Sequence, residues 1–227
     1  MRFRTLAVLL FLELLLRHAG TAQVVNKDSL MARASEKYPL DYEGVLKTNP
    51  LSMLWGSIPL TSEFMVLYEF VTAPQQASQV GISYIGKSPV LKAFEDTVPD
   101  LNLLTISGVR LQLSHRFYFL KSYDFAPRGL YLSPHISYAT AKVSTKHFSS
   151  QDVFVRINQF NLNTLLGWQW IYKRGHTLDV FGGLGYKDNF WEIHDAQNTI
   201  SLANDDMGKW YTGPVKLSFG FYFGLAL

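Results

Sequence analysis

The residues of this chain that could carry out covalent chemistry are few, and the clearest pair is His147 and Ser149. A histidine beside a serine can take the hydroxyl proton and make the oxygen a nucleophile. Ser114 and His115 are adjacent instead, so on a strand their side chains point to opposite sides. The sequence has no G-x-S-x-G, no H-E-x-x-H and no phosphate-binding glycine loop. We therefore expect no metal, no cofactor and no catalytic residues other than this one candidate pair.

Charged residues offer a second kind of chemistry, which is ion pairing inside the protein. They occur on the polar side of segments whose other side is apolar, and an isolated buried charge is very costly. We expect the carboxylates to pair with the cations in a polar network that fills the interior and leaves no open pore. The predicted network consists of Lys47, Glu63, Glu69, Arg110, Arg116, Asp179 and Lys216.

β-Strands must position these residues, because apolar and polar residues alternate with period two. In residues 215–227 every second residue is Val, Leu or Phe, and the residues between them are mostly small or polar. No run after residue 22 approaches the roughly 18 apolar residues of a membrane helix. The alternation predicts strands over 60–70, 109–119, 130–138, 160–172, 177–186 and 215–227, with two weaker strands over 45–56 and 78–86.

The connectors between these strands alternate in length, with the exception of a short first connector at 56–59. Short turns at one end and long loops at the other are typical of outer-membrane barrels. We therefore predict an all-β fold, a transmembrane antiparallel up-and-down barrel of about eight strands. The short connectors are 72–76, 124–129 and 173–176, and the long ones are 87–102, 144–152 and 194–212.

The bulky residues should face outward. The chain is 48% hydrophobic, 17% charged and 15% aromatic, which is unusual for a surface that faces water. An eight-stranded barrel is just wide enough inside to be filled by side chains, so the many large rings cannot all fit there. Rings near strand ends would anchor the barrel at the membrane interface. The predicted interface aromatics are Trp55, Tyr68, Trp168, Trp170 and Tyr172.

The N-terminal segment has the features of a secretory signal peptide. Arg2 and Arg4 precede an apolar stretch, and small residues precede Gln23. We expect residues 1–22 to be cleaved, residues 23–44 to form a periplasmic lead-in, and residues 45–227 to form the barrel. Removing residues 1–22 lowers the formal charge from +3 to +1, which leaves no strong basic patch for nucleic acid. The absence of cysteine excludes disulfides and the acylated cysteine of a lipoprotein.

The pair His147 and Ser149, two residues apart near a strand end, resembles the active site of the lipid A deacylases, which are small outer-membrane barrels. In that family an asparagine follows the serine and a glutamate lies on the next strand. Here Ser150 follows Ser149, and residues 158–164 contain no carboxylate. The resemblance implies a lipid-modifying enzyme, whereas these departures favour a solvated loop histidine.

The segment Lys47–Leu51, followed by Trp55–Leu60 and Glu63, resembles the opening hairpin of a group of small outer-membrane barrels from Bacteroidetes-type bacteria. The resemblance covers most of the chain after residue 22. It implies the barrel, without an established function and without catalytic residues. Members of that group usually end in Phe or Trp, the signal read by the barrel-insertion machinery, whereas this sequence ends in Leu227. We expect the alternating phenylalanines before it to compensate.

The function these features predict is that of an integral outer-membrane barrel with a plugged polar interior. It would have a structural or interaction role through its outer loops. Its partners would be outer-membrane lipid, the insertion machinery, and an envelope protein or glycan at the loops. Two alternatives are a lipid A-modifying enzyme and a soluble, lipocalin-like binder of a hydrophobic ligand.

Overall fold

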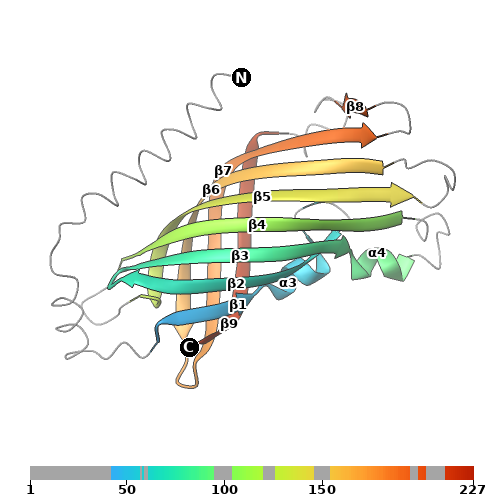
Figure 1. Cartoon of the computed structure of the whole chain (residues 1–227). Helices are drawn as coiled ribbons and strands as arrows, with labels where there is room; N and C mark the ends of the chain where they lie inside the picture. The colour runs from blue at the N-terminus through green and yellow to red at the C-terminus, as the bar shows by residue number, and fades with distance from the viewer. Residues whose placement is uncertain are drawn as a thin grey trace. The chain divides into compact units, whose positions relative to one another are not determined.

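The computed structural model describes residues 42–56, 58, 61–94, 104–119, 126–145, 154–194, 199–202 and 213–227. They form an antiparallel barrel whose first strands lie side by side in chain order (Figure 1). The strands are β1 Gly44–Thr48, β2 Thr61–Ala73, β3 Gln76–Lys87, β4 Leu104–Tyr118, β5 Gly129–Thr145, β6 Phe154–Ile171, β7 His176–His194, β8 Thr199–Leu202 and β9 Val215–Ala226, and the short helices are α3 Pro50–Leu54 and α4 Pro89–Phe94.

Eight of these strands close the barrel. Each strand from β1 to β6 pairs antiparallel with the next, and β9 pairs with both β7 and β1. Strand β8 adds only to the end of β7, beside Trp191–His194, and is not part of the ring. The predicted all-β, eight-stranded barrel is therefore confirmed as a fold. Among the described residues, no helix is long and apolar enough to cross a membrane.

The connectors alternate in length around only part of the ring. At one end, Pro74 and Gln75 join β2 to β3, and residues 172–175 join β6 to β7. The third connector at this end, between β4 and β5, is longer and spans residues 119–128, so the predicted short connector at 124–129 was wrong in its bounds. At the other end the connectors are residues 49–60, 88–103, 146–153 and 195–214. The prediction of a short first connector at 56–59 was wrong, because the chain leaves the sheet at residue 49 and returns at residue 61.

The predicted strand over 45–56 is confirmed only for its first part, for the same reason. Strand β1 ends at Thr48, and α3 begins at once, with Pro50 in its first turn. The side chain of Asn49 caps the helix by accepting a hydrogen bond from the backbone N–H of Ser52, at 3.2 Å. Asparagine is a favoured N-cap residue, and proline suits the first helical position because the N–H it lacks would have no helical partner there.

The outer face of the barrel is apolar and the inner face holds the charges. Phe219 is 80% exposed and Leu111 is 58% exposed, whereas Glu69 and Asp179 are fully buried. The alternation in the sequence therefore assigned the two faces correctly. Other large apolar residues exposed on the outer face are Phe64, Val66, Ile82, Leu113, Leu166, Val180, Leu184 and Leu217.

Strands β5, β6 and β7 continue well beyond their predicted limits of 130–138, 160–172 and 177–186, as far as the predicted long connectors. In these extensions the polarity is reversed: Lys142 and Arg156 are exposed, while Ala141 and Ile157 are buried. Because polar residues lie on the outer face there, the pattern used to predict the strands did not extend into these segments. The buried residues of this end form an apolar cluster, here called the upper core, made of Ile58, Ile85, Ala139, Ala141, Ile157 and Trp191.

Candidate functional site

Four charged residues meet inside the barrel, near the end with the short connectors. Lys47 Nζ forms ion pairs with the carboxylates of Glu69 and Asp179, the latter at 3.0 Å. Arg116 Nη1 lies 2.7 Å from Asp179 Oδ2 and 3.2 Å from Glu69 Oε2. The side chains come from β1, β2, β4 and β7, and each is at most 2% exposed. This ion cluster has two cations and two anions, so its formal charge is zero.

Neutral side chains complete the ion cluster. Gln169 Oε1 accepts hydrogen bonds from Lys47 and, at 2.9 Å, from Arg116. The hydroxyl of Tyr131 donates to Asp179 Oδ1 at 2.7 Å, and that of Tyr118 donates to Glu69. The guanidinium carbon of Arg116 also lies 4.1 Å from the centre of the Tyr131 ring. These contacts offset much of the cost of burying four charges, although Arg116 Nε is buried without a hydrogen-bond partner among the described residues.

A second ion pair lies farther toward the long connectors. Arg110 Nε lies 3.1 Å from Glu63 Oε2, and Arg110 Nη2 donates to Gln159 Oε1 at 2.9 Å. Both charged side chains are at most 5% exposed. Lys216, from the same predicted network, lies on the inner face of β9. It has no carboxylate within ion-pair distance in the part of the chain that the structure describes.

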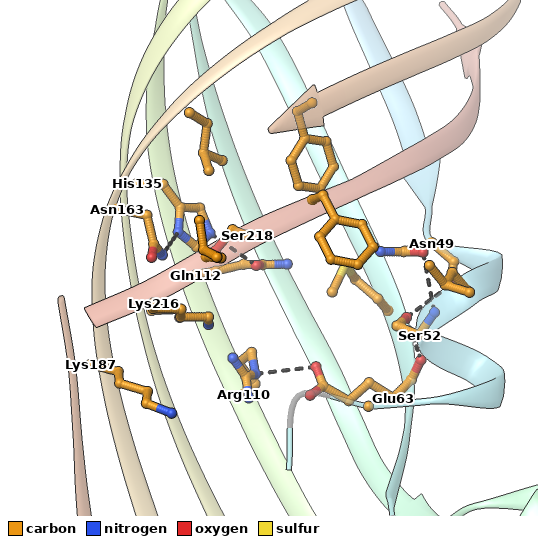
Figure 2. A pocket seen from close by; sticks show the side chains of 18 of the residues that line it. Asn49, Ser52, Glu63, Arg110, Gln112, His135, Asn163, Lys187, Lys216 and Ser218 are labelled. Carbon is orange, nitrogen blue, oxygen red and sulfur yellow. Dashed lines mark hydrogen bonds and ion pairs between the residues drawn. The ribbon is translucent and has the colours of Figure 1, made fainter. Parts of the chain in front are cut away.

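The interior is layered, and a cavity of about 810 Å³ is lined by residues that lie along the strands between the ion cluster and the upper core. Figure 2 shows residues that line this cavity. Its floor is aromatic, with the rings of Phe181 and Tyr222 stacked 4.7 Å apart beside Met65. A Cβ on Gly220 would lie 2.9 Å from Cζ of Phe181, so glycine lets this ring approach β9. The expectation of one polar network filling the barrel was therefore incomplete, because apolar side chains and open space occupy much of the interior.

His135 connects two amides on one wall of the cavity, as Figure 2 shows. Its Nδ1 lies 3.1 Å from Nδ2 of Asn163, and its Nε2 lies 3.2 Å from Oε1 of Gln112. A neutral imidazole that carries its proton on Nε2 satisfies both contacts. This leaves Nε2 of Gln112 and Oδ1 of Asn163, both buried, without a hydrogen-bond partner among the described residues.

The sequence alone did not assign these neutral polar residues to the site. Gln112 lies in phase with Arg110 and Arg116 on β4, and Gln169 lies in phase with Asn161 and Asn163 on β6. That shared phase was the available signal. The inward tyrosines Tyr118 and Tyr131 share the phase of the polar residues on β4 and β5, but tyrosine also occurs on the outer face, so residue type alone did not distinguish them.

The predicted interface aromatics all lie exposed outside the ring, between 40% and 63%. Trp170 and Tyr172 lie beside the β6–β7 turn, and Trp55 follows α3 at the opposite end. Tyr68 lies within β2, opposite Leu46 and Val80, so its predicted place near a strand end was wrong. Trp168 lies on the same face of β6 as Trp170, with ring centres 6.0 Å apart.

The candidate catalytic pair His147 and Ser149 lies outside the described residues. Within them, no group of three or more His, Asp or Glu side chains could hold a metal ion. Comparisons with protein-family models, with curated proteins and with solved structures gave no match for this chain. Membership of the Bacteroidetes-type group stays a prediction.

Proposed function

We propose that this protein is an integral outer-membrane β-barrel with a closed interior and a structural or interaction role through its long connectors. The reversed polarity of the barrel carries the proposal. A water-soluble, lipocalin-like barrel places apolar residues inside and polar residues outside. Here Lys47, Arg116 and Asp179 are buried while Leu217 and Phe219 are at least 75% exposed. So wide an exposed apolar surface needs a lipid or protein cover.

The apolar part of the outer face covers a limited length of the strands, which supports the proposal that this part lies in a membrane. On β6 it runs from Phe160 to Trp170, and that length suits the roughly 9–11 residues of a membrane-crossing strand. Beyond it the outward residues are Asn158 and Arg156, and the inward residues belong to the upper core. A barrel that leaves the lipid and enters water should reverse its polarity in this way, since water takes the place of acyl chains.

We expect the protein to behave as an intact membrane barrel on expression in a Gram-negative host. It should pellet with the outer membrane and resist extraction by urea. Unheated samples should migrate faster than boiled ones on an SDS gel, because a closed ladder of strand hydrogen bonds resists the detergent. Recovery of the folded protein in the soluble periplasmic fraction would contradict the proposal.

We also expect no ion conductance above leak in planar bilayers. The ion cluster and the aromatic floor fill one part of the interior, and the upper core fills another. Barrels of eight strands are just wide enough for side chains to fill them. The control is a bilayer treated with the same detergent without protein. Stable unitary currents that depend on the protein would show that the interior is open.

A further inference from the structure

Among the described residues, the wall of strands is incomplete beside the cavity. Because β1 stops at Thr48, β9 pairs with it only from Phe223 to Ala226, and β2 pairs with it only from Leu67 to Phe70. The described part of β9 from Val215 to Tyr222 therefore has a strand partner on one side alone, which is β7. An open strand edge in lipid must be covered by another group, because its backbone N–H and C=O groups would otherwise lack hydrogen bonds.

Helix α3 lies in this gap, bonded to β2 and also close to β9. Ser52 Oγ donates to the carbonyl oxygen of Glu63 at 2.9 Å, and the backbone N–H of Gly56 donates to that of Thr61 at 2.8 Å. The cavity passes between α3 and β9: its lining includes Leu51 and Trp55 on one side, and Leu217 and Phe219, whose side chains face outward, on the other. The lining of the cavity thus reaches the apolar outer face between α3 and β9.

The inner end of the cavity is cationic. Arg110, Lys187 and Lys216 line it, against the single carboxylate of Glu63 among the described lining residues (Figure 2). Glu63 attracts the ammonium group of Lys216, whereas Arg110 and Lys187 repel it. Gln112 adds a buried amide N–H group without a partner, as described above. Positive charge and a spare donor in a cavity of low dielectric attract an anionic group.

We propose that this cavity binds an anionic amphiphile, a molecule with one acyl chain and a carboxylate or phosphate head. The head lies against Lys216, Lys187 and Arg110, next to the amide of Gln112. The chain lies over Phe181 and Tyr222 and leaves between α3 and β9, where it covers the unpaired edge of β9. The acyl chain fills the apolar part of the cavity, and the cations select an anionic head over a neutral one. The inference deepens the proposed function, because the gap is useful to an amphiphile only where it faces lipid.

Binding can be measured with the purified full chain in nonionic detergent, by displacement of the fluorescent fatty acid cis-parinarate. Palmitate or palmitoyl lysophosphatidate should displace it at least about tenfold better than 1-hexadecanol, because loss of one hydrogen bond between charged groups has about that effect. The stronger of the two anionic competitors identifies the head group as a carboxylate or a phosphate. Equal displacement by 1-hexadecanol would overturn the proposal.

Two variants locate the site. Lys216→Gln should weaken palmitate or lysophosphatidate binding about tenfold, and Ser218→Phe should abolish it by filling the cavity beside β9. The matched control is Lys173→Gln, in the exposed β6–β7 turn, which should bind like the parent. Each variant must keep the heat-dependent gel shift, which shows that it is folded. If folded Lys216→Gln and Ser218→Phe bind like the control, the cavity is not the site.

The two proposals fail separately. A barrel that fractionates with the outer membrane but binds no anionic amphiphile would overturn the cavity assignment alone. A protein recovered in soluble form would overturn the membrane proposal, and with it the lipid-facing gap.

Discussion

Arg116→Met is expected to lower the free energy of unfolding by about 3–5 kcal/mol, the usual cost of removing one partner from a buried ion pair. Arg116 contacts both Glu69 and Asp179, and its side chain is 2% exposed. Without it, Lys47 alone faces two buried carboxylates, and the cluster gains a net negative charge. Methionine retains most of the side-chain length, so the loss arises mainly from charge and hydrogen bonding. The measurement is urea unfolding of the barrel in lipid vesicles.

A second substitution tests whether charge balance is the cause. Asp179→Asn in the Arg116→Met background leaves Lys47 paired with Glu69, so the cluster is again neutral. The double variant is expected to be more stable than Arg116→Met, although each change alone is destabilising. The matched control is Arg156→Met, on the exposed outer face of β6, where a change of less than about 1 kcal/mol is expected. A similar loss for Arg156→Met and Arg116→Met would contradict a special role of the ion cluster.

Leu111→Arg is expected to destabilise the barrel in a bilayer by about 2–4 kcal/mol, the cost measured for a cation on the lipid face of a barrel near the midplane. Leu111 lies on the outer face of β4, opposite Ile82 and Tyr138, and is already 58% exposed. In a water-soluble barrel the same change at an exposed position would have almost no effect. The substitution therefore reports which solvent this face meets.

Thr105→Arg is the matched control for Leu111→Arg. Thr105 lies on the same strand and the same face as Leu111, outside the apolar part of the outer face, and is also exposed. Near the interface the expected cost is at most about 1 kcal/mol. Refolding from urea into phosphatidylcholine vesicles gives both values. Equal costs at the two positions would argue against a bilayer around the middle of β4.

The sequence was a good guide to the two faces of the barrel but a poor guide to where strands end. Alternation depends only on which residues are apolar, and a strand sends successive side chains to opposite sides. It therefore placed Phe219 outside and Asp179 inside. It failed at Asn49 and Pro50, where a cap and a helix start interrupt the pattern, and in β5 to β7, where the pattern continues with its polarity reversed.

By itself, the sequence determined the strand character, the number of strands in the ring and the residues that face inward, because these properties are local. Only the tertiary structure decided which charges meet. Lys47 and Asp179 are 132 residues apart in the chain, and ring closure through β9 brings their strands close together. The same closure decided that β1 is too short to cover β9 and that a cavity remains behind it. A gap of this kind depends on the relative lengths of three strands, and no residue pattern within one strand encodes it.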